Sequence, residues 1–166
     1  MTTNPPTLLL GWGNEGRRDD GLGPALVRIL AERTLPGLTA SSSYQLEVED
    51  AFEVTRHSRV IFVDADRSGP EPFSFRRLLP AAHALSFSSH SVTPGALLAL
   101  GRELFDREPE AWLLGIRGYE FDRFDESLSA AARENLTAAA GFVASVLETG
   151  RFDEVMPTLT EWEGAK

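Results

Sequence analysis

The chain has 166 residues, 42% of them hydrophobic, and this length and composition predict one compact domain with a substantial core. It carries 25 acidic and 16 basic residues without a basic stripe, so we expect no nucleic-acid partner. The absence of cysteine excludes disulfides and thiolate chemistry, and the single lysine, Lys166, excludes a catalytic lysine inside the fold. With neither a signal-peptide pattern nor an apolar run of the ~18 residues that a membrane span needs, we expect a cytoplasmic protein without a membrane partner.

Strand patterns and helical periodicities alternate along the chain. The apolar or alternating segments that predict strands are residues 7–11, 44–48, 60–63, 72–79 and 112–116. The segments with helical spacing or capping signals are 22–35, 51–57, 94–104 and 132–147. We expect residues 1–150 to form a single α/β domain and residues 151–166 to form an acidic tail.

This alternation predicts a three-layer α/β/α sandwich of the phosphorylase/hydrolase-like type. Its sheet is expected to be twisted and mostly parallel, with residues 72–79 as an antiparallel edge strand. Ligands of such sheets bind outside the carboxyl ends of the strands. The loops that follow residues 11, 64, 79 and 116 are therefore the places to look for a site.

The first of these loops is rich in glycine and acidic residues. Gly11 to Gly16 form a G-x-G-x-x-G pattern after a strand, which is typical of dinucleotide-binding sites. However, several charged residues separate the glycines from the helical pattern, and Asp19 and Asp20 would repel a phosphate. One of these two carboxylates is enough to cap a helix. The other is then free to point into the crevice.

A second acidic position ends the apolar strand 60–63. Asp64 there either bonds the backbone amides of a turn or belongs to a site, since burying a carboxylate without partners is costly. With Asp66, it also resembles the first motif of the haloacid-dehalogenase phosphohydrolases. That motif normally follows the first strand and works with a lysine that this fold lacks.

Among the three histidines, His90 stands out because it lies in a serine-rich loop directly before a helix start at Thr93 and Pro94. We expect it at the same sheet edge as Asp20 and Asp64. Two carboxylates and one imidazole suit a divalent transition metal such as nickel or zinc.

Together these motifs resemble the hydrogenase maturation proteases, endopeptidases that trim the C-terminal extension from the large subunit of [NiFe] hydrogenases. The resemblance spans about residues 7–148. It rests on residues 10–14 (Leu-Gly-Trp-Gly-Asn), 18–23 (Arg-Asp-Asp-Gly-Leu-Gly), 63–65 (Val-Asp-Ala), His90, 114–116 (Leu-Gly-Ile) and 128–129 (Leu-Ser). Three features depart from the best-known members. Asp20 replaces a glutamate, residues 44–47 (Tyr-Gln-Leu-Glu) replace an Asp-Gly-Gly sequence, and residues 117–120 (Arg-Gly-Tyr-Glu) replace a proline-bearing loop.

The resemblance implies a partner, a metal and a set of site residues. The partner is the precursor of the hydrogenase large subunit, which carries the nickel itself, so no permanently bound metal is expected. Asp20, Asp64 and His90 are the implied catalytic and nickel-interacting residues. Gly11, Gly13 and Asn14 are expected to contact the substrate chain, with the Asn14 side chain fixing its own loop through backbone hydrogen bonds.

Two other functions remain open from the sequence. One is a dinucleotide- or phosphate-binding α/β enzyme that uses the loop from Gly11 to Gly16. The other is a non-catalytic nickel-binding assembly factor for hydrogenases that uses the same three site residues. A mass spectrum of the precursor after mixing separates the protease from the assembly factor, because only the protease shortens its partner.

Overall fold

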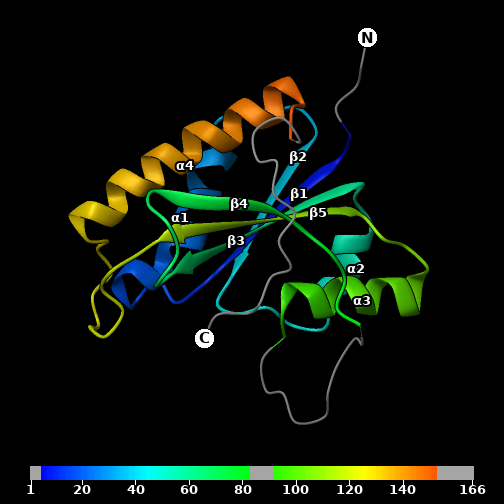
Figure 1. The fold of residues 1–166 in the computed structure, drawn as a ribbon, viewed down its shortest axis with the longest axis horizontal. Helices are drawn as coiled ribbons and strands as arrows, with labels where there is room; N and C mark the ends of the chain where they lie inside the picture. The colour runs from blue at the N-terminus through cyan, green and yellow to red at the C-terminus, as the bar shows by residue number, and fades with distance from the viewer. Residues whose placement is uncertain (1–4, 83–91, 153–166) are drawn as a thin grey trace.

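The computed structural model describes residues 5–82 and 92–152, which form one five-stranded sheet with helices on both faces (Figure 1). The strand order is β2-β1-β3-β5-β4. The first four of these strands run parallel, and β4 pairs antiparallel with β5 at the edge. The strands are β1 (Thr7–Trp12), β2 (Leu38–Ser43), β3 (Arg59–Asp66), β4 (Phe73–Leu78) and β5 (Glu110–Arg117). This confirms the predicted fold class, including the antiparallel edge strand.

Two helices cover each face of the sheet. α1 (Leu22–Ala31) and α4 (Ala130–Thr149) lie on one face, and α2 (Asp50–Thr55) and α3 (Pro94–Phe105) lie on the other (Figure 1). Each face has its own apolar cluster, because successive strand residues point to opposite sides: Ile61 and Val63 belong to the α1/α4 side, Val60 and Phe62 to the α2/α3 side. The sheet is therefore the middle layer of three.

Helix boundaries follow the capping signals of the sequence. The Thr93 hydroxyl accepts a hydrogen bond from Ala96 N at 3.1 Å, which starts α3 with Pro94 in its first turn. Ser129 accepts from Ala132 N at 3.3 Å and starts α4. Gly150 ends α4 in the left-handed conformation, with φ 70°. These ends agree with the sequence-based predictions.

The prediction for the second strand was wrong. Residues 44–48 form a bend and a turn, and the strand is instead β2, at residues 38–43. Its serine-rich sequence carries little apolar alternation because β2 lies at the sheet edge, where only Leu38 and Ala40 pack on the core beside α1. Two boundaries also moved: β3 continues through Asp66 rather than stopping at Asp64, and α1 ends at Ala31, before the predicted end near residue 35.

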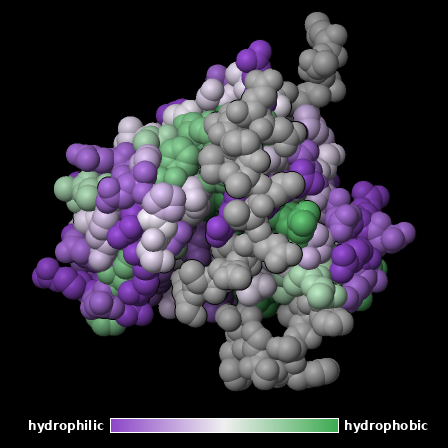
Figure 2. Space-filling view, in the orientation of Figure 1, coloured by the Kyte–Doolittle hydropathy of each residue, from purple (hydrophilic) through white to green (hydrophobic). Residues whose placement is uncertain are grey.

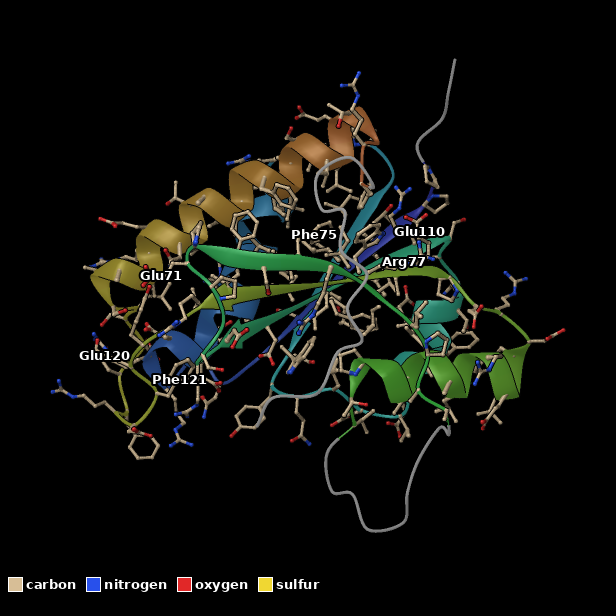
Figure 3. The ribbon with its side chains drawn as sticks, viewed as in Figure 1. Glu71, Phe75, Arg77, Glu110, Glu120 and Phe121 are labelled. Atoms are coloured by element: carbon tan, nitrogen blue, oxygen red, sulfur yellow. The ribbon has the colours of Figure 1, made fainter. Side chains whose placement is uncertain are left out.

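Phe152 packs into the core beyond the end of α4. Its side chain is 2% exposed, and its ring lies 5.6 Å from the Trp112 ring, with the Arg59 guanidinium 3.9 Å from its centroid. At the same end of the sheet, Arg77 and Glu110 lie close together, while Glu120 and Phe121 lie at the opposite end (Figure 3). The amino end of β5 is thus closed by an aromatic and ionic cluster that includes the start of the predicted tail.

The face of the molecule seen in Figure 2 is largely polar where the structure describes it. Figure 2 shows small apolar groups among hydrophilic side chains, which dominate the left and right margins of this face. Within residues 5–82 and 92–152, no helix has the length and apolar content needed to cross a lipid bilayer.

Candidate functional site

A cavity of about 200 Å³ lies at the carboxyl ends of the parallel strands and has two carboxylates in its wall. Asp20 reaches it from the loop after β1, and Asp64 reaches it from β3. The remaining lining residues are Trp12, Gly13, Tyr44, Gln45, Leu46 and Val92. This is the sheet edge where ligands of such folds bind. The sequence placed both aspartates there, and the structure brings them to the same cavity.

Asp64 lies on the side of β3 that faces α2 and α3, the same side as Val60 and Phe62. It is half-buried, and its Oδ1 accepts a hydrogen bond from Ala65 N at 2.8 Å. The next acid along the strand, Asp66, uses its Oδ1 to accept from Ser68 N and Gly69 N and so closes the turn after β3. The turn-forming and cavity-lining roles therefore belong to different carboxylates.

Asp20 is held by the backbone of its own loop. The 3-10 helix η1 (Arg18–Gly21) presents it beside the glycine loop, where its Oδ2 accepts from Asn14 N at 2.8 Å. This hydrogen bond orients the carboxylate within its loop. The half-buried Asp20 side chain thus stands as a fixed negative group in the cavity wall.

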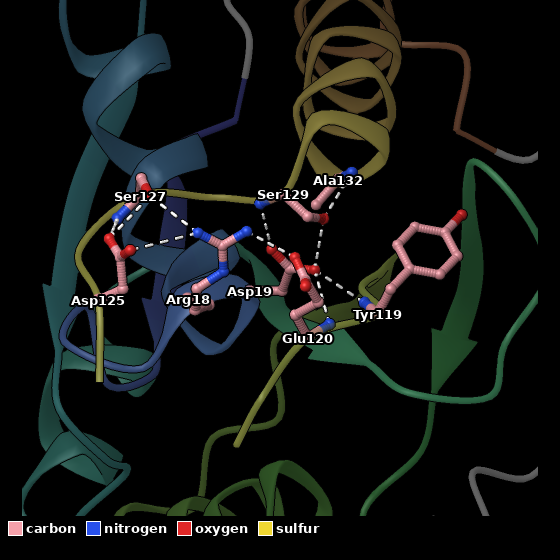
Figure 4. A network of polar contacts seen from close by, with 8 residues as sticks. All are labelled: Arg18, Asp19, Tyr119, Glu120, Asp125, Ser127, Ser129 and Ala132. Carbon is pink, nitrogen blue, oxygen red and sulfur yellow. Dashed lines mark hydrogen bonds and ion pairs between the residues drawn. The ribbon is translucent and has the colours of Figure 1, made fainter. Parts of the chain in front are cut away.

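Its neighbour Asp19 is fully buried, is absent from the cavity wall and points toward Ser129 and Tyr119 (Figure 4). Its Oδ1 accepts from Ser129 N at 2.8 Å. Its Oδ2 accepts from Tyr119 N at 2.8 Å, Glu120 N at 3.0 Å and the Ser129 hydroxyl at 2.7 Å. Burial raises the pKa of Asp19, but the hydrogen bonds from Glu120, Ser129 and Tyr119 outweigh it, so the pKa lies below its ordinary value. The aspartate pair is therefore divided between a structural anchor and a cavity residue.

Arg18 fastens the same junction from outside. Its guanidinium contacts Glu120 at 2.5 Å, Asp125 at 3.4 Å and the Ser127 hydroxyl at 2.9 Å (Figure 4). The hydrogen bond to Glu120 raises the pKa of Arg18, and the hydrogen bonds from Ser127 lower the pKa of Asp125. The loop that carries Asp20 is thus tied to the segment between β5 and α4, far away in sequence.

The glycines of the loop have different roles. Gly13 has φ +148°, and a Cβ there would lie 1.9 Å from the Asp20 carbonyl oxygen, so only glycine fits. Gly11 is buried in β1, where a Cβ would meet the Gly23 carbonyl oxygen at 2.6 Å and Val27 at 2.8 Å. Gly13 lines the cavity, whereas Gly11 lets α1 pack closely on β1 and lies outside the described cavity walls.

Asn14 organises the turn that follows. Its Oδ1 accepts from Gly16 N at 2.9 Å, which confirms the predicted backbone bond, and its Nδ2 donates to the Tyr44 hydroxyl at 3.3 Å. Asn14 also lines a second cavity of about 350 Å³, on the side of Tyr44 toward β2. Sequence reasoning did not single out Tyr44, because it placed this residue inside a predicted strand, whereas Tyr44 follows the end of β2.

The third predicted site residue, His90, lies outside the described residues. Val92, two positions further on, lines the cavity with Asp20 and Asp64. Among residues 5–82 and 92–152, no three acidic or histidine side chains are grouped closely enough to hold a metal ion. The described part of the site is therefore a pair of carboxylates.

The geometry disfavours a phosphate in the glycine loop. In a dinucleotide site the free amides of a helix N-terminus face the pyrophosphate. Here η1 precedes α1, Pro24 in the first turn of α1 has no N–H, and the Asp20 carboxylate occupies the cavity wall beside Gly13. A second negative group would be repelled at this position.

The chain has the fold of the [NiFe] hydrogenase maturation proteases. One such protein is the protease HycI from Thermococcus kodakarensis KOD1, with a TM-score of 0.67, 20% identity and coverage of 88% of this chain and 95% of that chain. The endopeptidase HycI from Escherichia coli has a TM-score of 0.64 and 21% identity, covering 88% of this chain and 94% of that chain. The endopeptidase HybD from Escherichia coli has a TM-score of 0.61 and 19% identity, covering 87% of this chain and 93% of that chain. No protein-family model and no curated protein matches the chain.

Proposed function

We propose that this protein is an endopeptidase that removes the C-terminal extension from the nickel-loaded precursor of a [NiFe] hydrogenase large subunit. The observation that carries the proposal is the meeting of Asp20 and Asp64 in one cavity, in a fold shared with such proteases. The two aspartates come from segments 44 positions apart in sequence, and both line the same cavity.

Nickel enters this proposal as part of the substrate. Carboxylates and an imidazole suit nickel, so Asp20, Asp64 and His90 would contact the ion that the precursor presents. That contact would place the scissile bond beside the cavity, and a precursor without nickel would not be held there. Recognition through the metal thus makes cleavage a check on nickel insertion.

Hydrolysis of a peptide bond needs an activated water, a polarised carbonyl and a proton for the leaving amine. Either a cavity carboxylate removes a proton from the attacking water, or the nickel polarises the scissile carbonyl. Gly13 lines the cavity, so its main chain would contact the substrate chain there. The cytoplasmic location stays a prediction from the sequence.

The test compares nickel-loaded and nickel-free precursor by mass spectrometry after incubation with the purified protein. The proposal expects the nickel-loaded precursor alone to be shortened, and expects Asp20→Asn, Asp64→Asn and His90→Ala to abolish the shortening. Binding of the precursor without truncation would instead identify a non-catalytic assembly factor. Full cleavage by the Asp20 and Asp64 variants would overturn the mechanism.

Asp66→Asn is the matched control. Asp66 lies on the same strand as Asp64 but does not line the cavity, and its Oδ1 alone accepts the two turn amides. An asparagine keeps that oxygen while removing the same unit of charge. Its cleavage rate should therefore stay close to that of the wild type.

A further inference from the structure

We propose that the C-terminal extension of the precursor lies in the second cavity and pairs its main chain with the open edge of β2 at Ser42. This inference rests on the proposed function and identifies where the released part of the substrate is held. Two observations support it: the two cavities share part of their lining, and the outer edge of β2 has main-chain groups that do not face β1.

The two cavities are neighbours. Gly13 and Tyr44 line both the cavity of Asp20 and Asp64 and the second cavity, whose wall continues along Ser42. Tyr44 is 67% exposed and is steadied by the Asn14 amide, so its side chain stands on the surface where one cavity meets the other. A polypeptide that leaves the first cavity on this side has to pass Tyr44.

The outer edge of β2 presents main-chain N–H and C=O groups that point away from β1. Thr7 N donates to Gly37 O, and Gly13 N donates to Ser43 O, so the odd-numbered residues of β2 face β1. In a parallel pair, a residue's N–H and C=O point to the same side, and alternate residues therefore face away. Ser42 is exposed and directs its N–H and C=O away from β1, and β2 is the last strand of the described sheet on this side.

An extended peptide is the occupant that fits these features. A strand edge recognises a peptide through main-chain hydrogen bonds, which need no particular side chain. Under the proposed function, the mature side of the precursor is held through its nickel. The extension has neither anchor, so a main-chain contact next to the cavity is the means by which the enzyme can hold it.

The experiment measures cleavage of nickel-loaded precursor by Ser42→Pro, with Ala40→Pro as the matched control. Both prolines remove an N–H that points away from β1, which an edge strand tolerates, but Ala40 does not line the second cavity. We expect Ser42→Pro to raise KM about tenfold, as the loss of a main-chain hydrogen bond implies, with little change in kcat. Ala40→Pro should resemble the wild type.

A precursor with a shortened extension separates a lost contact to the extension from a general structural defect, because a structural defect would impair cleavage of both precursors. With a precursor whose extension ends just after the scissile bond, Ser42→Pro should be cleaved as the wild type cleaves it. Equal KM values for Ser42→Pro and Ala40→Pro on the full extension would overturn the inference, as would a defect that persists with the short extension.

Tyr44→Ala provides a second test should Ser42→Pro melt below the assay temperature. It removes the side chain between the cavities and should also raise KM for the full extension only. An unchanged KM for Tyr44→Ala would count against the inference. If the wild type cleaves nothing, the proposed function itself fails, so the two failures are distinguishable.

Discussion

Replacing Asp19 by asparagine tests the division of labour between the adjacent aspartates. The carboxylate accepts four hydrogen bonds in a fully buried site. Whichever way an asparagine side chain turns, its NH₂ group faces at least one backbone N–H, of Ser129 on one side or of Tyr119 and Glu120 on the other. The variant therefore loses accepted bonds and the charge that strengthens them.

The magnitude follows from the burial. Breaking a buried, hydrogen-bonded charge costs about 3–5 kcal/mol, and we expect about 3 kcal/mol for Asp19→Asn because part of the network survives. For a chain of this length, 1 kcal/mol shifts the melting temperature by about 2–4 °C, so the variant should melt about 6–12 °C lower. Thermal unfolding followed by circular dichroism measures this shift.

The dependence of stability on pH provides an independent check of the Asp19 contribution. The pKa of Asp19 is lowered in the fold, so its contribution is complete above the ordinary aspartate pKa and is lost as the pH falls through the folded value. Asparagine does not titrate. The difference in stability between wild type and variant should therefore be constant above about pH 5 and should shrink below about pH 4.

Asp20→Asn is the comparison that separates anchor from site. Asparagine can still accept the Asn14 amide, and the side chain is only half-buried, so the melting temperature should fall by less than about 2 °C while cleavage is lost. The reasoning would be refuted if Asp19→Asn melted within about 2 °C of the wild type. It would equally be refuted if Asp20→Asn were the more destabilised of the two.

Three further predictions concern other parts of the fold. Phe152→Ala should lower the free energy of unfolding by about 3–4 kcal/mol, because the ring is 2% exposed in an aromatic cluster; chemical denaturation measures it. Gly13→Ala should abolish cleavage, because the new Cβ would collide with the Asp20 carbonyl. Its control is Gly141→Ala, which lies in open space on α4; it should raise the free energy of unfolding by about 0.5–1 kcal/mol and leave cleavage unchanged. Glu110→Gln removes the ion pairs with Arg59 and Arg77 and should lower the free energy of unfolding at neutral pH. The loss should be only about 1 kcal/mol, because these side chains are partly exposed and solvent screens their charges. Its deficit should fade below about pH 4: burial raises the pKa of Glu110, but hydrogen bonds from Trp112 and Arg59 outweigh that and hold it below its ordinary value.

The elements that the sequence predicted best are strands with a neighbouring strand on each side and helices whose ends carry capping residues. β1, β3 and β5 lie between neighbours on both sides and read as unbroken apolar runs, and α4 shows both its buried stripe and its terminal Gly150. β2 escaped prediction because it has one neighbouring strand, and its hydrogen bonds to β1 stabilise it without any apolar pattern.

In the described part of the candidate site, the sequence identified the two carboxylates that line the cavity but not their geometry. Strand ends identified Asp64, and the loop identified the pair Asp19 and Asp20. Which of the two faces the cavity depends on Tyr119 and Ser129, about 100 positions away, and no local pattern reports that contact. Tyr44 was missed because its place depends on where β2 ends.

The double use of Ser129 links two regions that otherwise would open separately. Its hydroxyl caps the first turn of α4 through Ala132 N and donates to Asp19, while its own amide donates to the same carboxylate. Fraying of α4 at this end therefore breaks the bonds that position the loop of Asp20. In native-state hydrogen exchange, the amides of Ser129, Ala132 and Tyr119 should exchange with one shared opening free energy, as a single cooperative unit.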